Sequence, residues 1–505
     1  MIGTFIAVLD ATIVNVALPK IMASFGTTVD KVEWVITAYM LVFGIVLPMS
    51  GWVADHLGYK RTYFLSLLLF TLGSFLCGLS WDESSLIVFR IIQGLGAGFI
   101  MPVGMAVVMR EFPTSQRGLA LGFWGIAAAA SVSFGPLIGG YLVDNVSWQA
   151  IFDVNVPVGI FGMFATAVIM REYRTETARD FDFLGCASMS VFLTTLLLAL
   201  SEGNASWNTG GWTSNFIITC FAISLVAFIV FIVVESTVEH PFVELKLFKD
   251  FNFAVTNMIL FVFGLSMFGS TFLLPLYLQT VMGYTAYQAG IVFLPVGILQ
   301  GIIAPISGVM SDKLDARIPA AIGIILLTLS LYLNSFLSLF TDNAQIMLPL
   351  YIRGFAMGLL FTPLSTLALG KIPREKMAQA SGLFNVIRQI GGSFGIAIFG
   401  TLLTRREIFH TALYGQAVNV NSEVYRAVTA NVSRFAQWMG GSTSNWAGMQ
   451  AGAIIGTNVV QQAFVQAVND SFFVAAAMSV VAVIPVIFIS VDKKKNIIKA
   501  APAAE

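Results

Sequence analysis

Apolar runs long enough to cross a bilayer recur along the whole chain. We identify fourteen, at 1–20, 34–54, 62–80, 85–109, 118–143, 154–171, 184–201, 215–235, 253–275, 287–310, 319–340, 346–369, 380–403 and 470–491. A hydrocarbon core about 30 Å thick requires about 20 residues of helix, and most of these runs reach that length. Only 11% of the 505 residues are charged. The sequence therefore predicts an all-α membrane protein with 14 transmembrane helices.

Charge and cysteine content exclude several other classes of protein. The net charge is zero, so nothing favours nucleic-acid binding. The three cysteines, Cys77, Cys186 and Cys220, lie in apolar segments without metal-ligand spacing, and we expect them to be buried small side chains. The chain contains no phosphate-binding loop of the kind that ATPases use. We therefore predict no metal and no cofactor.

Basic residues are distributed unevenly between alternate loops. The loops that follow even-numbered helices, together with the tail 492–505, contain 18 Lys and Arg. The other loops contain six, four of them in the long polar segment 404–469. Because basic residues are retained on the cytoplasmic side, we predict that both termini lie in the cytoplasm. The segment 404–469 is then an outward-facing loop.

An internal repeat divides the chain into two halves. The segment 50–57 recurs as 307–314, 257 residues further on, and Ser133-Phe134-Gly135 recurs 260 residues further on. This spacing predicts a six-helix bundle at 1–171, two inserted helices with linkers at 172–250, and a second six-helix bundle at 251–491. Repeated halves around a site at the bilayer midplane are typical of secondary transporters.

Asp10 lies within the first apolar run, about 13 Å along a helix from the first residue. A charge near the midplane costs at least roughly 2.5–3.5 kcal/mol, so ionisable residues at this depth are usually functional. We interpret Asp10 as a group that binds and releases protons. The alternative is a carboxylate that neighbouring helices satisfy without any functional role.

The turn between the second and third helices carries a specific motif, Gly-x-x-x-Asp-x-x-Gly-x-Lys-Arg, whose aspartate recurs in the second half. Its residues are Gly51, Asp55, Gly58, Lys60 and Arg61, with Asp312 at the repeat. With these residues the chain resembles the major facilitator superfamily, and within it the fourteen-helix drug:proton antiporters of the EmrB/QacA type. The resemblance implies that the motif gates alternating access.

Two further motifs extend the resemblance. Gly122, Gly135, Pro136 and Gly139 on the fifth helix match the antiporter signature, in which one glycine is replaced here by Ser131. In the family this signature accompanies export. Arg90 precedes helically spaced glycines on the fourth helix, and the resemblance implies that it contributes to proton coupling. The segments 148–159, 240–248 and 380–392 also resemble the family, although Asp153 departs from its usual pattern.

The resemblance implies a proton-coupled multidrug efflux transporter rather than an enzyme, exporting hydrophobic or amphipathic compounds. We expect the substrate cavity in the centre of the helices, with the candidates Phe123, Trp124, Met267, Phe268, Gln279, Phe361, Phe384, Asn385 and Arg388. Aromatic residues there often serve packing alone. The membrane bases Arg353 and Arg388 are expected either to pair with Asp10 or to bind an anionic substrate.

The outward segment 404–469 carries apolar residues in helical spacing near its end, at 459–467. The resemblance implies that it docks a periplasmic adaptor of the EmrA type, which is a membrane fusion protein, and thereby an outer-membrane channel. A lid or a loop without a partner is the alternative.

Other functions remain open at this point. An exporter of an endogenous metabolite, lipid or siderophore would share every motif. An uptake symporter is disfavoured by the signature of the fifth helix. A membrane enzyme or sensor would need a catalytic cluster or a soluble domain, and the three histidines, His56, His240 and His410, all lie outside the apolar runs.

Overall fold

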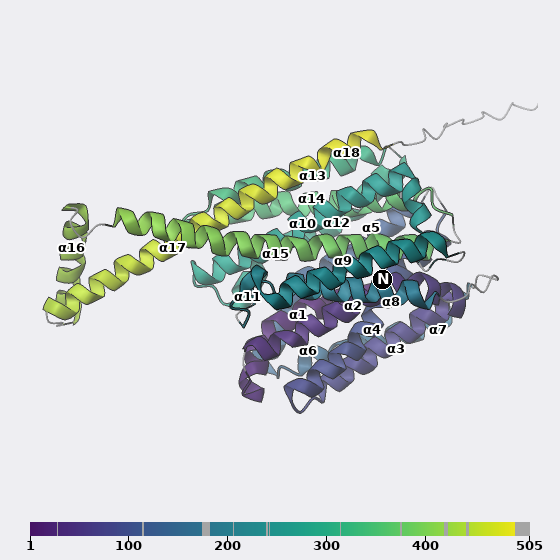
Figure 1. The fold of residues 1–505 in the computed structure, drawn as a ribbon, viewed down its shortest axis with the longest axis horizontal. Coiled ribbons are helices and arrows are strands. Elements are labelled where there is room, and N and C mark those ends of the chain that lie inside the picture. The colour runs from purple at the N-terminus through teal and green to yellow at the C-terminus, as the bar shows by residue number, and fades with distance from the viewer. Residues whose placement is uncertain are drawn as a thin grey trace, which may run out of the picture.

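The fold is a helical bundle with a long projection at one end (Figure 1). The computed structural model describes residues 1–489 except 28, 114–115, 174–181, 206, 239–240, 242, 314, 374–375, 419–422 and 441–443. Within these residues every regular element is a helix. The tail 492–505 and His240 lie outside the described residues.

The helices fall into three groups along the chain. The first is α1 (Ile2–Phe25), α2 (Val29–Leu57), α3 (Tyr59–Gly78), α4 (Glu83–Glu111), α5 (Arg117–Asn145), α6 (Ala150–Asp153) and α7 (Asn155–Ile169). Then come α8 (Phe183–Glu202), η1 (Gly211–Thr213), α9 (Asn215–Thr237) and η2 (Leu245–Lys249). The last is α10 (Phe251–Thr280), α11 (Ala286–Val292), α12 (Leu294–Lys313), α13 (Arg317–Leu333), η3 (Asn334–Phe336), α14 (Asn343–Leu369), α15 (Met377–Ala417), α16 (Glu423–Gly440), α17 (Ser444–Val481) and α18 (Val483–Phe488).

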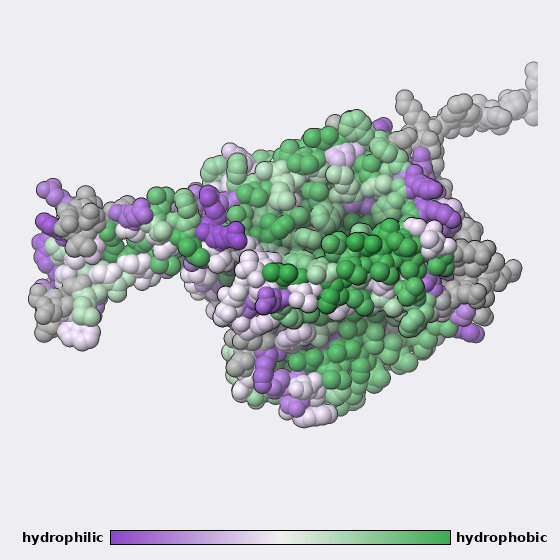
Figure 2. All heavy atoms as spheres, in the orientation of Figure 1, coloured by the Kyte–Doolittle hydropathy of each residue, from purple (hydrophilic) through white to green (hydrophobic). Residues whose placement is uncertain are grey.

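The prediction of an all-helical membrane protein is confirmed. Twelve helices of the described chain are long and apolar enough to span a membrane. Apolar side chains cover the middle of the bundle, and hydrophilic ones collect towards its two ends and on the projection (Figure 2). The predicted number of 14 also requires α1 and α5, which have 24 and 29 residues and pack against each other inside the bundle. The count of 14 stays a prediction.

Corresponding helices of the first and last groups pack in the same way. α1 packs on α5 as α10 packs on α15, α2 on α4 as α12 on α14, and α3 on α7 as α13 on α17. The two groups meet where α5 contacts α12 and where α2 contacts α15. α8 packs on α9 and also contacts α2 and α15. We call the first group the N-half and the last group the C-half.

The segment predicted as a loop at 404–469 is largely helical, so that interpretation was wrong. α15 runs for 41 residues and α17 for 38, roughly 60 Å each at 1.5 Å per residue, about twice the thickness of the hydrocarbon core. Both helices therefore continue beyond the bundle, and α16 connects their outer ends (Figure 1). We call this projection the hairpin, and the end of the bundle that carries it the hairpin end.

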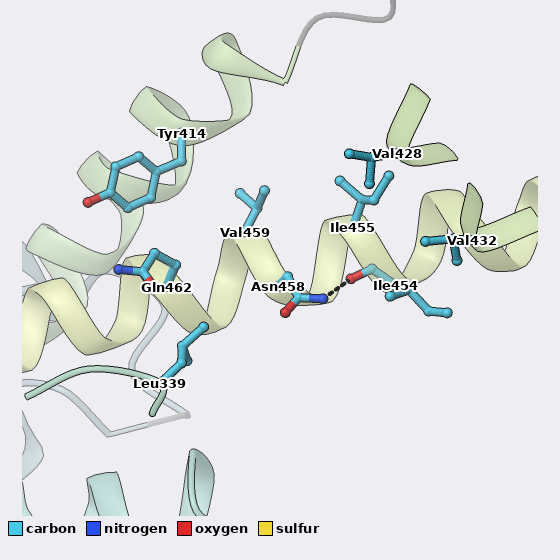
Figure 3. A pocket seen from close by; sticks show the side chains of 9 residues that line it. All are labelled: Leu339, Tyr414, Val428, Val432, Ile454, Ile455, Asn458, Val459 and Gln462. Atoms are coloured by element: carbon cyan, nitrogen blue, oxygen red, sulfur yellow. Dashed lines mark hydrogen bonds between the residues drawn. The ribbon is translucent and has the colours of Figure 1, made fainter. Parts of the chain in front are cut away.

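An apolar hollow lies where the hairpin leaves the bundle (Figure 3). The hollow is lined in part by Tyr414 of α15, Val428 of α16 and Val459 of α17. Leu339, between η3 and α14, also contributes. Asp470 accepts a hydrogen bond from Nε of Arg406 at 2.6 Å. The same carboxylate oxygen lies 2.8 Å from Nε2 of His410. These contacts tie α15 to α17 at the base of the hairpin.

One predicted span is divided into two helices, because the run 287–310 corresponds to α11 and α12. The run 154–171 corresponds to α7, which the short α6 directly precedes. The cysteine prediction is confirmed, because Cys77, Cys186 and Cys220 are all free and buried.

Candidate functional site

Asp10 forms a buried ion pair with Arg90. The carboxylate Oδ2 lies 2.5 Å from Nη1 of Arg90, and the two side chains are 0% and 1% exposed. Asp10 belongs to α1 and Arg90 to α4, so the pair joins two helices of the N-half. Arg90, rather than Arg353 or Arg388, is therefore the arginine that contacts Asp10.

Two neutral side chains also donate to this carboxylate. Nε2 of Gln93 and Nδ2 of Asn155 lie 2.8 and 3.1 Å from Oδ1 of Asp10. Ser74 accepts from Gln93 at 2.5 Å and from Asn155 at 3.5 Å, which connects α3 to the network. Burying a charge is costly unless it is paired and hydrogen-bonded, and here both carboxylate oxygens are engaged. The carboxylate of Asp10 is therefore paired and hydrogen-bonded on both oxygens.

Arg90 is fixed by contacts of its own. Its Nε donates to the carbonyl of Val35 at 3.1 Å, and its Nη1 donates to Oε1 of Gln93 at 2.6 Å. The guanidinium lies 4.0 Å from the centre of the Tyr39 ring, a cation–π distance. Since Val35 and Tyr39 belong to α2, a movement of α2 against α4 would change what holds Arg90 in place.

Sequence reasoning found the two charges of this network and missed its neutral members. Gln93 stands one helical turn after Arg90, inside the motif that identified the arginine. Asn155 lies inside the segment 148–159, in which Asp153 was the residue that departed from the family's pattern. Asp153 is exposed on α6, whereas Asn155 is fully buried.

The motif where α2 meets α3 forms a tight turn against the segment that follows α7. Gly58 has a φ of 96°, which favours glycine, and a side chain there would collide with Glu172. The backbone N–H of Lys60 donates to Glu172 at 3.1 Å, and Arg61 lies 3.7 Å from the same carboxylate. Asp55 accepts from the hydroxyl of Tyr59 at 3.0 Å. Gly51 packs against Gln379 of α15, so this region also contacts the C-half.

Asp312, the repeat of the motif aspartate, caps a helix of the other half. Its two carboxylate oxygens accept from the backbone N–H groups of Gly118 and Leu119, at 2.9 and 3.0 Å, in the first turn of α5. A carboxylate is favourable there because the N-terminus of a helix carries partial positive charge. A Cβ on Gly118 would lie 2.5 Å from the carbonyl oxygen of Gly308, so α5 and α12 touch through their backbones. The halves are therefore closed against each other at the end opposite the hairpin.

The glycines of the antiporter signature lie at two helix contacts of α5. Gly135 and Gly139 face Thr12 and Ile13 of α1, and Gly122 faces Ala304 of α12. The helix continues through Pro136 without interruption. α5 is thus packed against the helix of Asp10 on one side and against the C-half on the other.

Several of the predicted cavity residues converge between the halves. The ring of Phe361 stacks on Trp124 at 5.2 Å between centroids and meets Phe384 edge-on at 6.2 Å. The guanidinium of Arg388 lies 5.5 Å from the same Phe361 ring, and its Nη2 donates to Asn385 at 3.4 Å. This group combines α5 of the N-half with α14 and α15 of the C-half. We call Trp124, Phe361 and Arg388 the interface cluster.

The remaining candidates lie at different distances from this cluster. Phe268 packs against Gly392, one turn beyond Arg388 on α15. Met267 offers its carbonyl oxygen to Arg353 at 3.2 Å. Phe123 is 48% exposed on the outside of α5, and Gln279 is exposed in the last turn of α10. Neither of these two joins the cluster.

The relationship to known proteins agrees with this geometry. A family profile described as the Major Facilitator Superfamily matches residues 1–396. The chain belongs to this superfamily. Among curated proteins, this major facilitator is 33% identical over 483 residues to the multidrug export protein EmrB of Escherichia coli (strain K12), covering 95% of this chain and 92% of that protein. It is 30% identical to the fatty acid resistance protein FarB of Neisseria gonorrhoeae, covering 97% and 94%.

Solved structures support the same fold. The human organic anion transporter MFSD10 superposes with a TM-score of 0.63 at 12% identity, covering 96% of this major facilitator and 97% of that chain. At this identity the likeness concerns the fold alone. Family and fold together make the protein a multi-pass membrane transporter rather than an enzyme.

Proposed function

We propose that this major facilitator is a proton-coupled multidrug efflux transporter that exports hydrophobic or amphipathic compounds by alternating access. The observation that carries the proposal is the buried Asp10–Arg90 pair, in a chain with EmrB as a relative over nearly its whole length. A titratable carboxylate at the centre of the N-half gives the protein a group that can bind a proton from either side of the membrane. The proton gradient drives the cycle without a cofactor.

In this proposal Asp10 binds the proton, and Arg90 competes with the proton for the carboxylate of Asp10. In the arrangement described, Arg90, Gln93 and Asn155 all stabilise the ionised carboxylate. If α2 and α4 shift so that the guanidinium withdraws, the buried carboxylate loses its counter-charge, and protonation becomes favourable. One proton moving inward supplies about 2.3 kcal/mol per 100 mV of membrane potential and about 1.4 kcal/mol per pH unit. That supports accumulation from ten-fold to several hundred-fold.

The gate at the end opposite the hairpin is the second part of the mechanism. We propose that this end faces the cytoplasm, that both termini lie there, and that the membrane is the inner membrane. The basic residues of the loops at that end, such as Lys60, Arg61 and Lys313, support this orientation. Closure by Asp312 on α5 then separates the central site from the cytoplasm.

The hairpin is proposed to dock a periplasmic adaptor of the EmrA type, which connects to an outer-membrane channel. Its length supports this proposal, because α15 and α17 both continue far beyond the bundle. Exposed aromatic side chains on its surface, Phe435, Trp438 and Trp446, offer apolar contacts of the kind that protein partners bind.

The proton role of Asp10 is tested with the variant Asp10→Asn. Inverted membrane vesicles acidified inside are treated with a panel of cationic, neutral and anionic lipophilic compounds. Each transported compound should release protons from wild-type vesicles. The variant should still bind substrate, measured on purified protein, and should release no protons. Full proton release by the variant would refute the assignment.

Asp153→Asn is the matched control, because Asp153 belongs to the same half but lies exposed outside the network. It should behave as wild type. The panel also distinguishes a multidrug exporter from an exporter of one endogenous metabolite, lipid or siderophore, which would respond to few of the compounds.

A further inference from the structure

We infer that the C-half carries a binding site for an amphipathic organic anion, built on Arg388 of the interface cluster, with Arg353 on α14 as a second positive charge that attracts the anion. The inference deepens the proposed function, on which it rests, by naming a class of substrate. The ligand is a carboxylate or sulfonate joined to an aromatic or long apolar body.

The charge balance of the two halves is the first observation. In the N-half, Arg90 is neutralised by Asp10. In the C-half, α10 contains no charged residue, α14 contains Arg353 alone, and α15 contains Arg388 alone between 377 and 404. Two positive charges therefore lie in the spanning part of the C-half, and neither α10, α14 nor the part of α15 between 377 and 404 contains an acidic residue. An unpaired buried charge is costly, so a bound anion would stabilise this region.

In the described part of the chain, Arg353 is held by neutral groups alone. It is 2% exposed, and its Nη2 donates to Oγ of Ser270 and Oγ1 of Thr271 at 2.7 and 2.8 Å. Within the described residues its Nη1 is buried and has no hydrogen-bond partner. The side chain is thus anchored at one nitrogen and has a donor left over at another.

Arg388 has still fewer contacts. Its Nε has no hydrogen-bond partner in the described part of the chain, and its contact with Asn385 is long, at 3.4 Å. The guanidinium lies over Phe361, which stacks on Trp124. The indole Nε1 of Trp124 is also buried without a partner among the described residues. Unused donors therefore accompany an aromatic stack at the boundary between the halves.

This combination matches one ligand chemistry. Guanidinium groups form their strongest hydrogen bonds with planar anions, and Arg388 has donors to offer. The stack of Phe361 and Trp124 offers a flat apolar surface for the body of the ligand. A cation would be repelled by both arginines, and a neutral amide would gain less from them. Because the cluster joins α5 to α14 and α15, the anion would contact both halves.

Depth in the membrane agrees with a transport site. Arg353 is the eleventh residue of α14, and Arg388 is the twelfth residue of α15, roughly 16 Å from the beginning of each helix. The helices run in opposite directions, so both arginines lie near the bilayer midplane. Ionisable residues at this depth usually mark a substrate or ion pathway.

The test compares pyrenebutyrate with its primary amide, which has the same body and no charge. Binding to the purified full chain in nanodiscs is followed by energy transfer from tryptophan to pyrene, with empty nanodiscs as blank. Wild type should bind the acid about ten-fold or more tighter than the amide. Arg388→Gln should bring this ratio close to one, and Arg353→Gln should reduce it. Arg434→Gln, in the exposed part of α16, is the control and should leave the ratio unchanged.

Equal affinity for acid and amide in wild type would overturn the inference, as would a ratio unaffected by both substitutions. Arg388→Lys keeps the charge but not the planar fork, and should lower the ratio several-fold; it replaces Arg388→Gln if that variant does not fold. Failure here is distinguishable from failure of the proposed function. If compounds of the panel release protons while acid and amide bind alike, only the anion site is refuted. If no compound releases protons, the proposed function itself is refuted.

Discussion

A single amide shows how neutral side chains tune a buried carboxylate. Asn155 donates to Asp10 at 3.1 Å and to Ser74 at 3.5 Å, and it is fully buried. A hydrogen bond to a charged group contributes about 1.5–3 kcal/mol, so Asn155→Ala should favour the protonated form of Asp10. We predict that the pH profile of substrate-driven proton release moves upward by about one unit. The profile is measured in the inverted vesicles described above.

Asn145→Ala is the matched control for this substitution. Among the described residues, Asn145 donates to the carbonyl of Tyr141 alone, at the exposed end of α5. The pH profile of proton release by Asn145→Ala should coincide with that of wild type. A downward shift in Asn155→Ala, or equal shifts in both variants, would contradict the assigned role.

At this scale the sequence predicts charges better than it predicts their neutral partners. Asp10 and Arg90 stand out because ionised residues are rare in apolar runs. Ser74 and Asn155 do not, since small polar residues occur in many of the helices. Which of them converge on Asp10 depends on how α1, α3, α4 and α7 pack, and no local pattern contains that information.

The contacts at the N-terminus of α5 decide whether the molecule is closed at the end opposite the hairpin. Asp312 supplies a charged cap to this helix from the other half, a contribution of about 1 kcal/mol. Asp312→Asn keeps one acceptor oxygen but removes the charge. We predict that the open state at this end becomes roughly five-fold more populated. The change is measured by maleimide labelling of Gln379→Cys, a buried position facing Gly51, in a background without native cysteines.

Asp315→Asn is the control for this experiment. Asp315 lies three residues after Asp312, but its partner is Arg317 of the same half, at 2.5 Å. Hydrogen bonds from Arg317 hold the pKa of Asp315 below its usual range. Its removal should leave the labelling rate unchanged. Equal rates in Asp312→Asn and wild type would show that the cap does not hold the halves together.

Helix boundaries also depend partly on the local sequence and partly on tertiary packing. Hydropathy predicted the spans because the bilayer requires apolar length. It failed at 404–469, where α15 and α17 extend beyond the bundle and the solvent no longer demands apolar residues. The helical spacing at 459–467 was the one local sign of this continuation, and it falls within α17. A polar helix supported by its neighbour resembles a loop when composition alone is considered.

At the scale of the whole molecule, the proposed function gives the hairpin and the bundle separate tasks. The bundle contains the Asp10 network, the Asp312 cap on α5 and the interface cluster. At the base of the hairpin, Asp470 of α17 contacts Arg406 and His410 of α15 and holds the two helices together. A cut above this contact should therefore leave the bundle folded.

We predict the outcome of replacing 415–458 with a short flexible linker. The purified variant should retain proton-coupled transport in vesicles, because no residue of the central site is removed. In double-membraned cells that also produce the adaptor, it should lose drug resistance, since docking is abolished. The measurement pairs vesicle transport with growth in drug. Resistance equal to that of the full chain would refute the docking proposal, and loss of transport in vesicles would favour a lid that takes part in the cycle itself.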